Sequence, residues 1–230
     1  PAAPQTPTEQ QSAQNPEPVT EPEPAPAPEP ESPPMHSLVD VDFSNGGRDA
    51  SAYGSTLNDV TNGAHFTAGK EGDGFHITAD TNFYIDNSAT QIFGLEAFDI
   101  GFDIRKDEDD SFGGLLNQQQ VLDLTVRANG ALRLKLKTDE GSIKLRTEKD
   151  VLQDTDWHRI NVTYDSDKGL AQILVDGEVM ASGALTGRTA EAGRRDFVVG
   201  DPWHESVAAT IDNLQITRPA TAEEIAAATP

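Results

Sequence analysis

One short segment near the end of the chain gathers side chains that could recognise a sugar. Residues 200–205 read Gly-Asp-Pro-Trp-His-Glu, so an indole, an imidazole and two carboxylates stand close together. Binding of a sugar needs an aromatic surface for the apolar face of the ring and polar groups in fixed positions for its hydroxyls. Asp201, Trp203 and His204 are therefore candidate ligand-binding residues. The alternative interpretation is that Trp203 packs over the edge of the fold.

A second candidate site lies between Phe98 and Arg105. The apolar residues 98, 100, 102 and 104 alternate with polar residues and a glycine, which is the period of a half-buried strand. Gly101 lies among charged neighbours on the polar face and could form the floor of a shallow groove, with Asp103 and Arg105 binding the ligand. The alternative for these two residues is a surface ion pair.

Two acidic clusters are better interpreted as solvated turns than as metal sites. They are residues 107–110 and the pair Asp165 and Asp167. The second cluster lacks the glutamate that an EF-hand loop places at its twelfth position. The five histidines also lack the spacing of a metal-binding set.

The elements that must position these residues are strands. The segment from Trp157 to Gly183 contains two alternating strands joined by a polar turn, and then a third strand after Asp176-Gly177, a pair that suits a two-residue hairpin turn. Similar patterns recur at about a dozen places with Gly, Asn or Asp between them, which indicates an all-β fold, an antiparallel β-sandwich. Near the C-terminus, Thr221 and Glu224 could cap a short helix.

Composition divides the chain into three parts. Residues 1–34 hold 12 of the 15 prolines and six glutamates, with no Lys, Arg, Leu, Ile or aromatic residue. Such a segment cannot bury enough apolar surface to fold, so residues 1–35 are predicted to form a disordered Pro/Glu-rich linker. Residues 36–218 are predicted to form the sandwich, and residues 219–230 a tail.

The charge and the absence of cysteine narrow the possible partners and the location of the protein. Without the six glutamates of the linker, 33 acidic and 17 basic residues remain, a net charge of −16, which disfavours nucleic acid as a partner. The chain contains no cysteine, so disulfides and thiolate metal sites are excluded. No apolar run approaches the about 20 residues that would span a bilayer. Because a Pro-Glu spacer suits exported proteins, we expect a secreted or cell-surface location.

Three segments carry a family resemblance. Trp157-His158, the strand from Ile160 to Asp165 and the Asp176-Gly177 turn occur in the order found in the laminin G-like branch of the concanavalin A-like lectin/glucanase superfamily. Leu38 to Gly54 is similar to the opening strand and loop of that family, and Ala208 to Ile216 to its closing strand. The resemblance spans about residues 36 to 218 and implies a jelly-roll sandwich. This fold hosts lectins, adhesion modules and glycosidases alike.

The resemblance also implies a structural calcium ion. Members of the superfamily often join their first and last strands through such an ion, and calcium prefers six to eight oxygen ligands. The matching positions are Asp42 or Asp49 near the start and Asp212 in the closing strand, with backbone oxygens from a loop such as residues 72–74. The alternative is that these aspartates cap loops and face solvent.

The sequence gives little support for catalysis. Glycosidases of the superfamily place two glutamates around an aspartate on one strand face, and no Glu-x-Asp-x-x-Glu occurs here. We therefore expect a non-catalytic module of an exported protein that binds a polysaccharide or a glycan-bearing surface. The alternatives are a protein-interaction domain without a sugar site and, less favoured, a polysaccharide-degrading enzyme.

Overall fold

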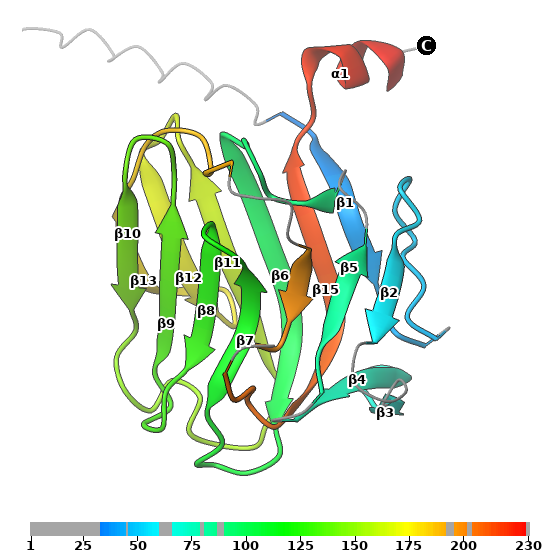
Figure 1. The fold of residues 1–230 in the computed structure, drawn as a ribbon, viewed down its shortest axis with the longest axis vertical. Helices are drawn as coiled ribbons and strands as arrows, with labels where there is room; N and C mark the ends of the chain where they lie inside the picture. Colours follow the sequence, from blue (N-terminus) through cyan, green and yellow to red (C-terminus); the bar gives the residue numbers. More distant parts are fainter. Residues whose placement is uncertain are drawn as a thin grey trace, which may run out of the picture. The chain divides into compact units, whose positions relative to one another are not determined.

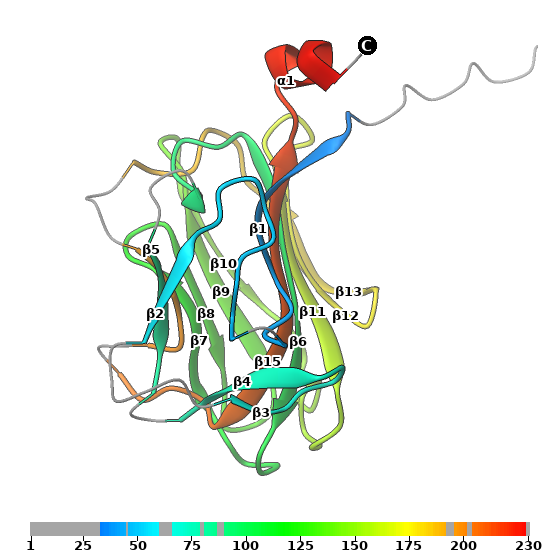
Figure 2. The same cartoon turned by 90° about the vertical axis from the view of Figure 1, so that its right-hand side faces the viewer.

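The fold consists of two antiparallel β-sheets packed face to face, as Figures 1 and 2 show. The computed structural model describes residues 33–44, 46–59, 66–78, 81–86, 90–191, 196–201 and 204–228. The predicted linker lies outside the described residues as far as residue 32, and Met35 is already the first residue of a strand.

Sheet A contains eight strands in the described part of the chain and lies behind sheet B in Figure 1. Its neighbours run in the order β13 (Glu178–Ala184), β12 (Leu170–Val175), β11 (His158–Asp165), β6 (Ala97–Lys106), β15 (Ala209–Pro219), β4 (Asp73–Ile77) and β3 (Phe66–Ala68), with β1 (Met35–Val41) also paired to β15. The opening and closing strands predicted from the family resemblance are thus direct neighbours, β1 and β15.

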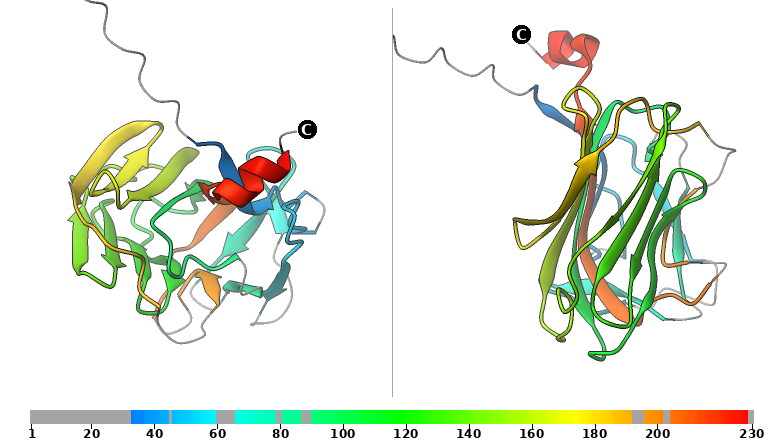
Figure 3. Two further views of the ribbon diagram at one scale, coloured as in Figure 1. Left: turned by 90° about the horizontal axis from the view of Figure 1, so that it is seen from above. Right: turned by 90° about the vertical axis from the view of Figure 1, so that its left-hand side faces the viewer.

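Sheet B contains seven strands in the described residues. Their order is β10 (Ser142–Arg146), β9 (Leu132–Lys137), β8 (Leu122–Val126), β7 (Gly113–Gln118), β14 (Phe197–Val199), β5 (Phe83–Asp86) and β2 (Thr56–Asp59). The predicted all-β antiparallel sandwich is confirmed. The neighbours β7 to β10, β11 to β13 and β3 to β4 follow the sequence order, whereas the remaining neighbours are not consecutive in the chain, because the chain crosses between the two layers that Figure 3 shows in end view and side view.

The apolar core lies between the two sheets and follows from the alternation of the strands. Phe98, Ile100, Phe102 and Ile104 of β6 are each at most 2% exposed, as predicted for the inward face. Sheet B supplies the opposing layer through alternate leucines of β8 and β9, at positions 122, 124, 132, 134 and 136. Burial of each such side chain contributes about 1.5–3 kcal/mol of hydrophobic stabilisation. The core therefore leaves the alternate polar positions of β6, β8 and β9 on the outer faces.

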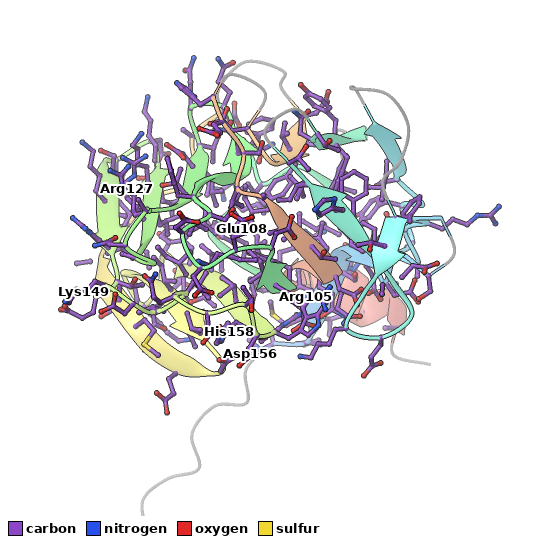
Figure 4. All side chains as sticks on the ribbon, turned by 90° about the horizontal axis from the view of Figure 1, so that it is seen from below. Arg105, Glu108, Arg127, Lys149, Asp156 and His158 are labelled. Atoms are coloured by element: carbon purple, nitrogen blue, oxygen red, sulfur yellow. The ribbon has the colours of Figure 1, made fainter. Side chains whose placement is uncertain are left out.

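The Asp176-Gly177 turn has the predicted hairpin geometry. Both residues have positive φ, 52° and 83°, as a two-residue turn of the type that matches strand twist requires. The turn also contacts His158 of β11, whose ring nitrogens lie 2.7 Å from the Asp176 carboxylate and 2.8 Å from that of Asp154. Burial lowers the pKa of His158, but the hydrogen bonds to these two carboxylates outweigh it, so its pKa lies above the ordinary value. Figure 4 shows His158 at this end of the sandwich.

The tail forms the predicted short helix, α1 (Ala222–Ala228). The N–H of Thr221 donates to the Glu224 carboxylate at 2.7 Å, and the N–H of Glu224 donates to the Thr221 hydroxyl at 3.3 Å. This reciprocal pair is a capping box. Arg218 of β15 donates two hydrogen bonds of 2.8 Å to Glu224, which together with Thr221 holds the pKa of that carboxyl far below its usual range. None of the described helices has both the length and the apolar character to cross a bilayer.

Candidate functional site

A groove lies on the outer face of sheet B, where four neighbouring strands contribute polar side chains in one row. The strand register places Asn117 of β7 opposite Asp123 of β8, Asp123 opposite Lys135 of β9, and Lys135 opposite Lys144 of β10. Their neighbours along each strand point into the core, so these four face outward. Adjacent strands are about 4.8 Å apart, so the row extends about 14 Å from β7 to β10.

The ends of the strands border the groove, which forms an open cavity of about 460 Å³. The β7–β8 turn contributes Gln119 and Gln120, and Gln120 has the positive φ of a tight turn (67°). Ser142 and Ile143 contribute from the start of β10. Amides, a hydroxyl, ammonium groups and carboxylates thus surround a space of the size that small-molecule sites have. Such groups can donate to and accept from the hydroxyls of a sugar.

Asp201 and His204, both predicted from the sequence, lie at the border of this groove. The Asp201 side chain packs against Gly114 of β7 so closely that a Cβ at Gly114 would stand 2.2 Å from the Asp201 Cβ. The N–H of Asp201 donates to the Ser206 hydroxyl at 2.8 Å, which fixes the loop. The His204 ring lies 3.1 Å from the Asp201 carboxylate and is 80% exposed, whereas the Asp201 side chain is 7% exposed. A buried carboxylate therefore orients an accessible imidazole. Trp203 lies outside the described residues.

Two buried polar atoms on the outer face of sheet B lack a hydrogen-bond partner among the described residues. They are Asn117 Oδ1 and Arg133 Nε. Asp123 is 2.7 Å from Lys135 and 3.9 Å from Arg133. Buried polar atoms are normally satisfied, so the unpaired oxygen of Asn117 marks an internal position next to the groove that is less well satisfied than its surroundings.

The other predicted ligand residues, Asp103 and Arg105, belong to the outer face of sheet A and are not brought together with Asp201 and His204. Asp103 is 4% exposed and accepts hydrogen bonds from Lys70 at 2.9 Å and Asn213 at 2.8 Å. Arg105 instead lies over the ring of Trp157, 4.9 Å from its centroid. These two residues are thus committed to contacts within the protein and do not form an ion pair with each other.

The expected groove at Gly101 is filled by a side chain. A Cβ at Gly101 would stand 2.5 Å from an Arg159 guanidinium nitrogen, so the guanidinium covers this glycine. Arg159 also donates to the Asn213 carbonyl at 2.9 Å and lies 3.7 Å from Asp103. The absence of a side chain at Gly101 therefore makes room for the guanidinium of Arg159.

The three aspartates predicted to hold calcium are used as hydrogen-bond acceptors. Asp42 accepts from the backbone N–H of Ser44. Asp49 accepts from the backbone N–H groups of Asp40, Ser51 and Ser55, and Asp212 from those of Lys70, Glu71 and Asn213. Burial raises the pKa of Asp49, but these N–H groups outweigh it and hold the pKa below its usual value.

The same three aspartates do not form one cluster. Asp42 and Asp49 line a shared surface depression, and Asp212 is not part of it. No three His, Asp or Glu side chains within the described ranges form a group that could hold a metal ion. The residue set does not fit a shared calcium site, and calcium binding stays a prediction.

Sequence reasoning missed most of the groove, because its residues come from four strands whose register the sequence does not give. The alternating cations of β9 and β10 were a usable signal. They stand at positions 133, 135 and 137 and at positions 144 and 146.

Comparisons with known proteins agree with this architecture. The binding domain of paraclostridial mosquitocidal protein 1 superposes with a TM-score of 0.65 at 15% identity, over 82% of this chain and 50% of that one. The binding domain of botulinum neurotoxin DC in complex with SialylT gives 0.61 at 13% identity, over 82% and 50%. That of botulinum neurotoxin serotype G gives 0.60 at 16% identity, over 84% and 50%. The chain thus spans half the length of these structures, and at such low identity the likeness shows the fold.

The sequence itself identifies the family. No curated protein matches the chain. Residues 97–226, more than half of the chain, match the family of laminin G-type domains described as the concanavalin A-like lectin/glucanases superfamily. This stretch begins at β6 and runs through β15 into α1, so it includes the groove strands and the Asp201–His204 loop. The chain belongs to the concanavalin A-like lectin/glucanase superfamily.

Proposed function

We propose that the protein is a non-catalytic glycan-binding module and that the glycan lies in the groove on the outer face of sheet B. The observation that carries the proposal is the row formed by Asn117, Asp123, Lys135 and Lys144, which continues into the Asp201–His204 pair. The row combines an amide, a carboxylate and two cations, and an oriented imidazole borders the same cavity. These groups match the hydroxyls and substituents of a sugar chain.

Two features favour binding over hydrolysis. The carboxylates that line the groove are already engaged, since Asp123 pairs with Lys135 and Asp201 holds His204. Several of the similar solved structures are binding domains, one of them in complex with SialylT. Another similar structure is of botulinum neurotoxin type C, whose cell entry is described as dependent upon interaction with two ganglioside molecules. A hydrolase of this superfamily would instead require one carboxyl group to act as an acid and a second to act as nucleophile or base.

The proposal is tested with a glycan array and one matched pair of variants. Asn117→Ala removes the amide from the groove, whereas Asn161→Ala removes an amide from the outer face of sheet A, where Asn161 donates to Asp99. Loss of one hydrogen bond to a ligand costs about 1 kcal/mol, so we expect roughly fivefold weaker glycan binding for Asn117→Ala and no change for Asn161→Ala. Equal losses for both variants, or silence of the wild type across the array, would refute the proposal.

Protein recognition is the second candidate. One similar structure is the binding domain of botulinum neurotoxin DC in complex with rat synaptotagmin II. This function would be favoured by tight binding to a protein ligand that persists in Asn117→Ala and His204→Ala, together with silence on the glycan array.

We extend the proposal to the location of the protein. A Pro/Glu-rich spacer over residues 1–35 would connect the module to other parts of an exported protein and raise its effective concentration at a glycan-bearing surface. Fractionation of cells that produce the natural protein tests this location. Recovery of the chain in the cytoplasm alone would contradict it.

A further inference from the structure

The basic residues of this acidic protein are concentrated on one part of sheet B. Seven of its 17 lysine and arginine residues lie between residues 127 and 149, where only three residues are acidic. Strand alternation places five of the seven on the outer face of β9 and β10. We call these five the basic strip: Arg133, Lys135, Lys137, Lys144 and Arg146. Arg127 and Lys149 extend the cationic side toward the end of the molecule that Figure 4 shows, while His158 lies on the side of β11 and β12.

The strip brings like charges directly opposite one another. The register pairs Lys135 with Lys144 and Arg133 with Arg146 across β9 and β10. Opposed like charges destabilise an antiparallel pair, so folding alone gives no reason for this arrangement. The only carboxylate within 4 Å among the described residues is Asp123, which reaches Lys135 and Arg133. Lys137, Lys144 and Arg146 are exposed and have no ion-pair partner in the part of the chain that the structure describes.

The strip is continuous with the groove, because Lys135, Lys137 and Lys144 also line the cavity. Cations on one strand face repeat about every 7 Å, and the two strands are about 4.8 Å apart. The charges therefore form an elongated field and not a pocket for one ion. A linear ligand with repeated anionic groups fits this field.

Two observations distinguish among polyanions. Among the described residues, the strip has no aromatic side chain on which nucleobases could stack. The described residues with large exposed apolar side chains, which a membrane surface would need, also lie elsewhere: Met35, Phe66, Phe112, Val179 and Ile225. The net charge of −22 also repels a polyanion outside the strip. This repulsion is strongest for DNA, which carries one charge per about 1.7 Å of axis, and weaker for a polymer with sparser charges.

We propose that the partner of the groove is an acidic polysaccharide whose carboxylate or sulfate groups bind the basic strip. This inference rests on the proposed glycan-binding function and names the class of glycan. The neutral amides and hydroxyl at the groove contact the sugar hydroxyls, and the ammonium and guanidinium groups contact the anionic substituents. Binding depends on salt, because each contact releases counterions and exposed charges are screened over about 8 Å at physiological ionic strength.

The test uses three polysaccharides with one backbone: dextran, carboxymethyl dextran and dextran sulfate. The full chain is titrated with each by calorimetry at two salt concentrations. We expect binding to one or both charged polymers and at least tenfold weaker binding to dextran. The charged polymer that binds identifies the anionic group.

A matched pair of variants locates the contact. Lys144→Gln with Arg146→Gln removes one lysine and one arginine from the strip, and Arg48→Gln with Lys168→Gln removes the same charges elsewhere. We expect the strip variant to bind the charged polymer about tenfold more weakly, with a salt dependence lower by about one unit of log–log slope for each contact removed, and the control to stay within twofold of wild type. Equal losses in both variants would overturn the proposal, as would tighter binding to single-stranded DNA or to anionic phospholipid vesicles through the same residues.

The outcomes also separate this inference from the proposed function. Binding of neutral glycans that is lost in Asn117→Ala but unchanged in the strip variant would leave the glycan-binding function standing and refute the acidic partner. Silence toward every polysaccharide would refute both.

Discussion

The outer faces of the two sheets use charge in opposite ways. On sheet A, Asp103 and Asp212 are paired across β6 and β15, and both are buried. Lys70, Arg159 and backbone N–H groups surround them. On sheet B, like-charged Lys135 and Lys144 are also paired across strands, but they remain exposed with Asp123 as a single acidic neighbour.

The comparison teaches where to look for function in a fold of this kind. Polar groups that satisfy one another stabilise the protein, and polar groups that are left exposed and unpaired can bind a partner. By this criterion we infer that sheet A is the structural face, and we propose sheet B as the binding face. The following predictions test that division, beginning with the largest expected effect.

The largest effect is expected for Asp212→Ala on sheet A. This change leaves the N–H groups of Lys70, Glu71 and Asn213 without the acceptor that they share, a residue that is 0% exposed. Unpaired buried donors cost about 1–3 kcal/mol, so we expect the melting temperature to fall by about 5–10 °C, with glycan binding of the folded protein retained. Thermal unfolding measures the change. The control is Asp42→Ala at an exposed position, and an equal fall in both variants would contradict this account.

A pair of glycine variants compares the faces directly. Gly114→Ala on sheet B drives a Cβ to 2.2 Å from the Asp201 Cβ, which must move with its backbone, whereas Gly101→Ala on sheet A meets the mobile end of the Arg159 side chain. Overpacking of this kind costs about 1–3 kcal/mol. We therefore expect Gly114→Ala to lose stability and glycan binding together, and Gly101→Ala to keep glycan binding. Calorimetric titration checks both. Loss of binding only in Gly101→Ala would reverse the assignment of the faces.

The pH dependence of stability tests the charges at the end of sheet A where β11 begins. Asp154 and Asp176 stabilise protonated His158, whose pKa is raised, so its contribution is complete below about pH 6.5 and is lost as the pH rises through the raised pKa. The pKa values of the two aspartates are lowered, mainly by hydrogen bonds from His158 against the opposing effect of burial, and their contribution is lost as the pH falls through those values.

Because both aspartates are more than half exposed, we expect a difference of only about 1 kcal/mol between wild type and His158→Gln. This difference should shrink above neutral pH in urea unfolding curves. If the free energies of unfolding of the two proteins changed in parallel from about pH 5 to about pH 9, the contacts of His158 with Asp154 and Asp176 would contribute no pH dependence.

The smallest effect is expected from removal of calcium. Since Asp49 and Asp212 already accept several N–H groups each, a chelator should change the melting temperature by less than about 1 °C. A fall of several degrees would show that calcium is bound. A fall that disappears in Asp42→Ala would place the ion in the depression that Asp42 shares with Asp49.

The sequence was sufficient for the sandwich but not for its binding face. Apolar and polar residues alternate clearly in strands such as β6, β9 and β11. The pair Asp176-Gly177 also tolerates the positive φ angles that its hairpin turn requires. In contrast, β7 begins with two glycines and contains a register shift between Gly114 and Leu116, so no alternation marks it. Because β7 supplies Asn117 and the contact of Gly114 with Asp201, the groove depends on a strand that could not be predicted from alternation in the sequence.

Single residues also show why the site was only partly predicted. Asp201 and His204 were singled out because they belong to a loop rich in polar and aromatic side chains, and the structure places both at the border of the groove. Asp103 looked equally suitable, but its partners Lys70 and Asn213 come from 33 and 110 residues away in the chain. Whether a carboxylate is free or engaged depends on such tertiary contacts, which composition and spacing do not specify.

The most direct test of the binding face is amide chemical-shift mapping by NMR during titration with a polysaccharide that binds. The account predicts that the largest shifts occur at Asn117, Asp123, Lys135, Lys144 and His204, with small shifts at Gly101 and Asn161. Shifts concentrated at Gly101 and Asn161, with the β7–β10 residues unchanged, would contradict it.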